Sequence, residues 1–338
     1  MLRRTLQYKS FEDLSKDTLL LASRVPADVD IVAGVPRSGL LAANLLALFL
    51  NKPLADIDGL LEGRILSSGQ RTSFLFSSAS PSPDRPPKIL VVDDSVAKGL
   101  AIQAVREKIR QSNISGSFIY GAVYVCPGAA HHVDYYARVV PRPRLFEWNL
   151  LHHAYLNHCC VEIEGVLCRN PTMEERNNES RSRHFIEHAT PNILTSFEVG
   201  CLVTTRPEQY RQQTEAWLAR HGIRYRRLLM AGNAEGVGQT QIETSSAWKA
   251  DVYRNEKYLL FIENDRWVAE AIARRTGKKV YCVGAGEMIS PPPRATFLHN
   301  VRWLVSKSRQ SLSNPGWALR RGVRAAESLL RRTARANS

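Results

Sequence analysis

The first 150 residues alternate between short, uninterrupted apolar runs and longer stretches in which apolar positions recur with a helical period. Apolar runs bounded by turn residues predict strands, and the periodic stretches predict the helices that connect them. The predicted strands are Asp30–Gly34, Lys88–Asp93 and Ser117–Cys126, and the predicted helices are Leu40–Leu50 and Ala101–Gln111. This alternation is typical of a parallel β-sheet with crossover helices.

A second alternation of the same kind begins near His158. The predicted strands are Cys159–Ile163, Gly200–Thr204, Arg224–Met230, Tyr258–Glu263 and Lys279–Val283, and the predicted helices are Glu208–His221 and Asp265–Thr276. The polar segment Asn170–Pro191 interrupts this pattern and is expected to form an insertion or small cap. The sequence therefore predicts an α/β fold with two doubly wound parallel-sheet domains.

The length of 338 residues suits two domains, since single domains usually hold about 100–200 residues. We place the first domain at residues 1–150, the second at 157–289 and a basic, partly helical tail at 290–338. Hydrophobic residues make up 44% of the chain and charged residues 23%, which excludes wholesale disorder. No run approaches the roughly 18 apolar residues of a membrane-spanning helix, so we expect a soluble, cytoplasmic protein.

The formal net charge of +14 is concentrated in the tail, where ten basic residues follow Pro291 and Glu327 is the one acid. The pattern of Trp317–Arg335 predicts a basic amphipathic helix. Such a helix suits weak contact with an anionic membrane or RNA, and docking on the protein itself is the alternative.

The six cysteines show no CxxC spacing, and we expect them to be buried free thiols. The adjacent pairs His131-His132 and His152-His153 are expected on strands, where neighbouring side chains diverge, so a shared metal ion is not predicted. The string Asp56-Ile57-Asp58-Gly59 is expected to be a structural or substrate-facing turn.

Two strand-to-helix loops in the first half have residues suited to a phosphorylated sugar. After the strand Lys88–Asp93, the chain continues through Asp94 and a small-residue loop into a helix. Backbone N–H groups at a helix N-terminus suit a phosphate, and adjacent carboxylates suit ribose hydroxyls or hydrated magnesium. A simple helix cap is an equally good interpretation of this stretch alone. The second loop, Val35–Gly39, offers backbone amides and the Arg37 guanidinium for a diphosphate.

Together these loops resemble the type I phosphoribosyltransferase family, over about residues 1–150. The resemblance implies that Asp93 and Asp94 contact the ribose of 5-phosphoribosyl diphosphate (PRPP), take part in catalysis and help to hold Mg²⁺. It implies that the 5-phosphate is bound by a loop made of Ser95, Val96, Ala97, Lys98 and Gly99. It also implies that the pyrophosphate is bound by a loop made of Val35, Pro36, Arg37 and Ser38. The segment Arg64–Arg71 matches the flexible catalytic loop, with Arg64 and Arg71 as its cations. Ala97 and Leu100 depart from the family, which often has Thr or Ser there.

The resemblance implies an Mg²⁺-dependent enzyme, a phosphoribosyltransferase that transfers phosphoribose from PRPP to an unidentified acceptor and releases pyrophosphate. A PRPP-binding regulatory protein without turnover needs the same pocket and is the alternative. The aromatic segment Arg144–Asn149 is a candidate for the acceptor site, although packing is the more ordinary role for such side chains. Many members of the family are dimers, so the resemblance also allows a homodimer.

The second half carries acids, a hydroxyl and a lysine in an order that resembles the haloacid dehalogenase-like (HAD) superfamily, over about residues 157–288. The resemblance implies a site made of Glu162, Glu164, Thr204, Lys249, Glu263 and Asp265, with Mg²⁺ bound through Glu162 and Asp265 and helped by Glu263. That family uses Asp where this chain has Glu162 and Glu164, and the extra methylene displaces the attacking oxygen. We therefore expect a degenerate phosphatase, with an active phosphatase for a phosphoribosyl compound as the alternative.

Overall fold

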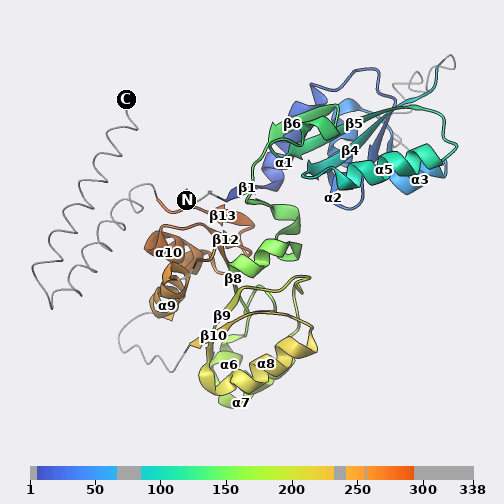
Figure 1. Ribbon diagram of the computed structural model, residues 1–338. Helices are drawn as coiled ribbons and strands as arrows, with labels where there is room; N and C mark the ends of the chain where they lie inside the picture. The colour runs from blue at the N-terminus through green and yellow to red at the C-terminus, as the bar shows by residue number, and fades with distance from the viewer. Residues whose placement is uncertain (1–5, 67–84, 232–240, 256, 293–338) are drawn as a thin grey trace, which may run out of the picture. The chain divides into compact units, whose positions relative to one another are not determined.

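The computed structural model describes residues 6–66, 85–231, 241–255 and 257–292 (Figure 1). The chain divides into two compact units, Met1–Leu150 and Leu151–Ser338. Each unit is built on its own mainly parallel sheet, which confirms the predicted α/β class. The predicted tail helix and most of the segment Ser67–Pro87 lie outside the described residues.

The first unit contains a five-stranded parallel sheet in the order β3-β2-β4-β5-β6 and a separate parallel pair, β1 with β7. Its elements are β1 (Gln7–Lys9), α1 (Phe11–Ala22), β2 (Ile31–Gly34), α2 (Ser38–Leu50), β3 (Leu54–Asp56), α3 (Ile57–Leu61), β4 (Lys88–Val96), α5 (Leu100–Gln111), β5 (Ser117–Val125), η1 (Ala130–His132), β6 (Tyr135–Val139), β7 (Arg144–Phe146) and η2 (Glu147–His152).

Apolar side chains of the five-stranded sheet alternate between its two faces. Ile89 and Val91 of β4 pack on one face with Ile102 of α5. Leu90, between them, packs on the opposite face with Leu46 of α2. Because successive side chains of a strand point to opposite faces, one apolar strand serves both cores.

The first unit differs from the sequence expectations at its edges. Helix α1 was not predicted, although Ser10 and Asp13 form a capping box at its start, with the Asp13 N–H donating to Ser10 Oγ at 3.1 Å. Strand β4 continues to Val96 because Ser95 and Val96 pair with Tyr124 and Val125 of β5. The loop after the acids is therefore shorter than predicted.

The second unit contains a six-stranded sheet in the order β10-β9-β8-β11-β12-β13, in which β12 and β13 alone are antiparallel neighbours. Its elements are η3 (Ala154–His158), β8 (Cys159–Glu162), α6 (Met173–Asn177), α7 (Glu179–His188), β9 (Cys201–Pro207), η4 (Glu208–Tyr210), α8 (Arg211–Arg220), β10 (Leu228–Ala231), α9 (Gln241–Asn255), β11 (Leu260–Glu263), α10 (Arg266–Thr276), β12 (Val280–Cys282) and β13 (Glu287–Ile289). Strand β10 starts at Leu228, four residues later than predicted.

The segment Asn170–Pro191 forms the two short helices α6 and α7, in keeping with the predicted insertion. A capping box at Thr172 and Glu175 begins α6, and the Asn178 side chain caps α7. The buried indole of Trp217 on α8 donates its Nε1–H to the Ala189 carbonyl at 2.8 Å, which fixes the end of this insertion against the unit.

All six cysteines are buried free thiols. Burial raises the pKa of both Cys159 and Cys168 to about 12. His131 and His132 lie in the 3₁₀ helix η1 and not on a strand as expected, and their ring centroids are 4.0 Å apart. Among the described helices, none is long and apolar enough to cross a membrane.

Leu90 provides a test of the sheet, because its side chain is fully buried in the central strand β4. We expect Leu90→Ala to lower the free energy of unfolding by about 2–5 kcal/mol, since it leaves a cavity in the core. Urea denaturation followed by circular dichroism measures the change. Leu48→Ala on α2, at a side chain 72% exposed, is the matched control and should change stability by less than about 0.5 kcal/mol. Equal losses in the two variants would contradict this core.

Candidate functional site

The two loops predicted from the sequence meet at one edge of the first unit's sheet. Strands β2 and β4 are parallel neighbours, with Gly34 paired to Val92, so both loops leave the sheet at its carboxyl edge. Ser38 Oγ at the start of α2 donates to Asp94 Oδ1 at 2.8 Å, which joins the loops directly. Gly39 makes this approach possible, because a Cβ there would lie 2.9 Å from the Val92 carbonyl oxygen.

The acidic pair Asp93 and Asp94 is buried and held by specific donors. Asp94 Oδ2 accepts the indole N–H of Trp148 at 2.8 Å, and Asp93 Oδ1 accepts the Asp94 backbone N–H at 2.9 Å. Burial, followed by the nearby Asp94 carboxylate, raises the pKa of Asp93 to about 8. Asp93 therefore keeps its proton to a higher pH than an ordinary carboxyl, whereas Asp94 accepts a hydrogen bond at each oxygen.

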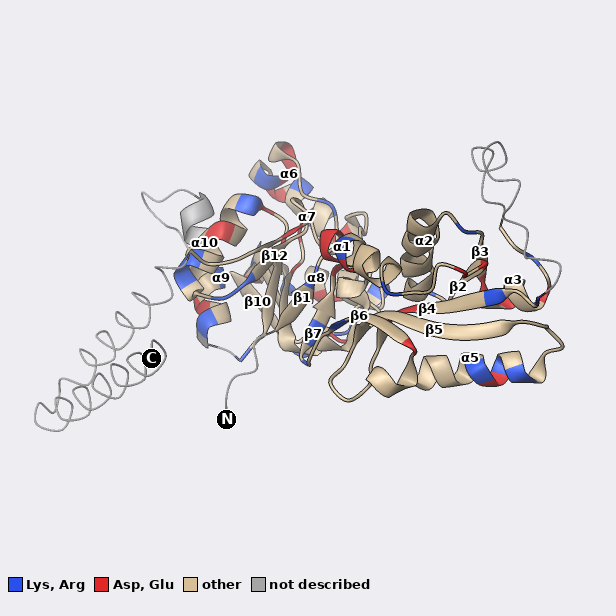
Figure 2. Cartoon of the chain, turned by 90° about the horizontal axis from the view of Figure 1, so that it is seen from above, with Lys and Arg blue, Asp and Glu red and all other residues tan. Residues whose placement is uncertain are grey.

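Residues Ala97 to Gly99 connect β4 to α5. Gly99 has a φ of 71°, and a Cβ there would lie 2.4 Å from the His132 ring, so only glycine suits this position. The half-buried His132 therefore forms a wall of the loop, a contact that the sequence analysis missed because nothing local signals it. Figure 2 shows that the charged positions of α5 lie in its C-terminal half, which leaves no acid near its N-terminus.

The cations predicted for the first unit are distributed unevenly. Arg37 and Lys98 are exposed at the two loops. Arg64 is also exposed, and it forms an ion pair with Glu62 at 2.7 Å. Arg71 lies outside the described residues.

The remaining residues of the predicted pyrophosphate loop have different exposures. Val35 is buried and donates its N–H to the Val92 carbonyl at 2.9 Å, whereas Pro36 is exposed. The peptide between Pro36 and Arg37 is cis. In the segment Arg144–Asn149, Trp148 contacts the acidic pair, and Phe146 stacks on Trp148 with ring centroids 4.9 Å apart.

A cavity of about 730 Å³ opens in the second unit at the carboxyl ends of its central strands. Its walls come from the ends of β8, β9 and β11 and from α6, α7 and α9. The cavity contains all the acids and the lysine predicted there: Glu162, Glu164, Lys249, Glu263 and Asp265. The described residues of the second unit thus bring these five sequence-predicted positions to one place.

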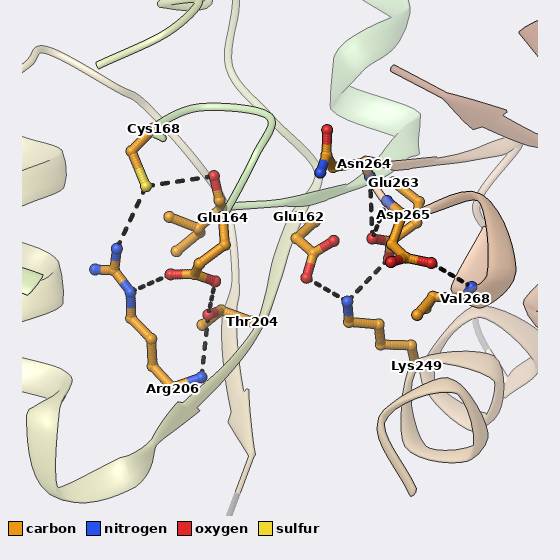
Figure 3. A network of polar contacts seen from close by, with 11 residues as sticks. Glu162, Glu164, Cys168, Thr204, Arg206, Lys249, Glu263, Asn264, Asp265 and Val268 are labelled. Carbon is orange, nitrogen blue, oxygen red and sulfur yellow. Dashed lines mark hydrogen bonds and ion pairs between the residues drawn. The ribbon is translucent and has the colours of Figure 1, made fainter. Parts of the chain in front are cut away.

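Lys249 lies at the centre of one half of this cavity, with only 2% of its surface exposed (Figure 3). Its Nζ forms ion pairs with Glu162 and with Glu263, the latter at 2.9 Å. Burial lowers the pKa of Lys249, but the two carboxylates outweigh it and raise the pKa above its ordinary value. Burial, together with the neighbouring Glu263, raises the pKa of Glu162 well above its usual range, so Glu162 holds a proton more readily than its neighbour.

Glu164 lies at the centre of the other half. It accepts a hydrogen bond from Thr204 Oγ1 at 2.7 Å and forms an ion pair with the Arg206 guanidinium. Burial raises the pKa of Glu164, but Arg206 and then Thr204 outweigh this effect and hold that pKa below its usual value. The role of Arg206 was not predicted, although it follows Thr204 by two residues at the end of β9 and that position was the available signal.

The chain matches no protein-family model. It also matches no curated protein.

Solved structures give remote likenesses. A Helicobacter pylori xanthine-guanine-hypoxanthine phosphoribosyltransferase is 20% identical, with 42% of this chain and 92% of that chain covered and a TM-score of 0.32. A purine phosphoribosyltransferase from Pyrococcus horikoshii is 17% identical, with 43% and 94% covered and a TM-score of 0.31. A chain of the Pnkp1/Rnl/Hen1 RNA repair complex is 15% identical, with 82% and 95% covered and a TM-score of 0.29. At these TM-scores the likenesses assign no function, which has to come from the chain's own residues.

Proposed function

We propose that the first unit binds PRPP and transfers its phosphoribosyl group to an acceptor, with release of pyrophosphate. The observation that carries this proposal is the Ser38–Asp94 hydrogen bond of 2.8 Å. It joins a loop with an exposed arginine to a strand end with two acids. A sugar that bears phosphates at both ends needs such a pair of loops, because its hydroxyls and its phosphates require different partners.

The phosphates have suitable partners at both loops. Arg37 and Lys98 are exposed and can neutralise negative charge. Helix α5 follows Gly99 with no side-chain cap, so its first N–H groups are available to a ligand of the loop. Helix N-termini favour anions through these N–H groups and the helix dipole. Ala97 and Leu100 have no hydroxyl groups to offer a phosphate. These backbone amides and Lys98 are therefore the main phosphate contacts in the proposal.

In the proposal, the acidic pair Asp93 and Asp94 provides hydrogen-bond partners for the ribose hydroxyls. Asp94 now accepts hydrogen bonds from Ser38 and Trp148, and a ribose diol would exchange with one of these donors without leaving the carboxylate unpaired. The raised pKa of Asp93 favours a carboxyl that keeps its proton and can donate it in a hydrogen bond to the same sugar. Such an exchange keeps the Asp94 carboxylate hydrogen-bonded.

In the proposed reaction, the C1–oxygen bond to pyrophosphate breaks, a bond from C1 to the acceptor nucleophile forms, and the nucleophile loses its proton to water or a base. Pyrophosphate leaves with the electrons of the broken bond, so its charge must be neutralised. Each Asp94 oxygen already accepts a hydrogen bond, so in this proposal magnesium enters with the diphosphate as part of the substrate. Arg37 supplies further positive charge to the leaving group.

A PRPP-binding regulator without turnover remains the second candidate, and the state of Arg64 favours it. Arg64 is exposed and paired with Glu62 at 2.7 Å, so it must leave that partner before it can reach a diphosphate. Pyrophosphate release separates the two candidates. Release that depends on an added acceptor supports the transferase, whereas PRPP binding with no release in an acceptor screen supports the regulator.

Calorimetry with magnesium and PRPP tests the site in the full-length protein. We expect micromolar binding that Asp94→Asn weakens about tenfold to a hundredfold, because a hydrogen bond to a charged group contributes about 1.5–3 kcal/mol. Asp58→Asn, which removes the same charge from an exposed residue of α3, is the matched control and should bind normally. A folded wild-type protein that does not bind PRPP would contradict the proposal.

The pKa of Asp93 predicts a pH dependence of stability. A carboxyl whose folded pKa is raised from 3.8 to about 8 contributes stability that is present below pH 3.8 and is lost as the pH rises through about 8. We therefore expect wild type to lose stability relative to Asp93→Asn as the pH increases from about 4 to about 9. Urea denaturation at several pH values measures this difference. Parallel pH profiles of wild type and Asp93→Asn would show that the raised pKa is wrong, and Asp58→Asn should follow wild type throughout.

A further inference from the structure

The cavity of the second unit has no open set of ligands for a divalent metal. The resemblance noted in the sequence implies Mg²⁺ at Glu162 and Asp265, with Glu263 nearby. Among the described residues, no group of three His, Cys, Asp or Glu side chains is placed to hold a metal ion. The reason is visible in the partners that these oxygens already have (Figure 3).

Each of the three acids is committed to a donor of the chain. Glu263 Oε2 accepts Lys249 Nζ at 2.9 Å, and its Oε1 accepts the backbone N–H groups of Asn264 and Asp265 at 3.0 and 3.2 Å. Glu162 Oε1 accepts Lys249 as well. Asp265 Oδ1 caps α10 by accepting the Val268 N–H at 3.0 Å. A metal at these acids would compete with an ammonium and with backbone donors for the same three carboxylates.

Displacement of the Lys249 ammonium from Glu162 and Glu263 is unfavourable. Its side chain is 2% exposed, so an ammonium displaced from the two carboxylates would remain buried without a counter-ion. An unpaired buried charge is strongly unfavourable. The residue after Glu263 is Asn264, a neutral amide, and the next acid, Asp265, already accepts the Val268 N–H.

The opposite half of the cavity follows the same rule. The Thr204 hydroxyl and the Arg206 guanidinium are natural donors to an anion, yet both are bound to Glu164. Arg206 is fixed further by Thr214, whose Oγ1 accepts Arg206 Nη1 at 3.3 Å. The cavity therefore satisfies its own anion donors as well as its own carboxylates.

We infer that Lys249 is the resident cation of the second unit, taking the place of a divalent metal between Glu162 and Glu263. The wild-type cavity then has no divalent-metal site, and removal of the lysine creates one. A ligand of this cavity therefore binds without a metal ion between it and the protein. The side-chain amides and hydroxyls that line it include Asn170, Asn177, Thr205, Gln209 and Asn264.

The test uses Mn²⁺ and the full-length protein, with bound and free Mn²⁺ distinguished by electron paramagnetic resonance. Wild type and Glu162→Gln should bind Mn²⁺ identically, because any site of wild type lies elsewhere. Lys249→Met removes the ammonium and keeps a side chain of similar length. We expect it to bind Mn²⁺ at least tenfold more tightly than wild type, and Lys249→Met/Glu263→Gln should lose this gain.

Two results would overturn the inference. One is a tenfold loss of Mn²⁺ affinity in Glu162→Gln, which would place a metal beside Lys249 in the wild-type cavity. The other is a folded Lys249→Met protein, with the circular dichroism spectrum of wild type, that gains no Mn²⁺ site.

Folding of the lysine variant does not limit the test. If Lys249→Met fails to fold, the comparison of wild type with Glu162→Gln still decides the question. Glutamine keeps the shape of Glu162 and an oxygen that can accept the hydrogen bond from Lys249, so Glu162→Gln is a conservative change. Equal Mn²⁺ binding by these two proteins supports the inference, and the loss described above contradicts it.

Discussion

Parallel pairing of adjacent strands is the constraint on which both sites depend. In the first unit, the pairing of Gly34 with Val92 aligns β2 with β4, so the segments that follow them emerge at the same edge. In the second unit, β8 lies between β9 and β11, and their carboxyl ends surround the cavity. Residues distant in sequence meet there because parallel strands end on the same side. The chemistry of each site then follows from the few side chains placed just after these strand ends.

The two sites treat buried charge differently. In the first unit the acids are buried, while Arg37 and Lys98 are exposed and available to a ligand. In the second unit the acids and their cations are buried together, as in the pair of Glu164 and Arg206. Burial without a partner is costly for any ion, so each buried ion of the second unit is held to its partner and is less accessible to a ligand. The cations at the first unit's loops are therefore the more exposed ones.

The sequence predicted the central strands because their apolar runs are buried on both faces, as in Lys88–Asp93. It did not predict the short β1 and β7, whose pairing depends on contacts between residues 7 and 144. Aligned strand ends also explain why the acids named from the sequence lie together in each unit. The His132 wall and the Arg206 ion pair were missed, because each depends on a neighbour supplied by another element. Side-chain partners are set by tertiary packing, which local patterns do not encode.

The buried thiols can serve as probes of local opening in the second unit. Five of the six free cysteines belong to it, and one, Cys126, belongs to the first unit. A buried thiol whose pKa is near 12 is seldom a thiolate, and only the thiolate reacts quickly with an alkylating reagent. Modification must therefore wait for a transient opening that admits solvent to the sheet. The alkylation rate of each strand cysteine would therefore report how often its strand separates from the neighbouring strands.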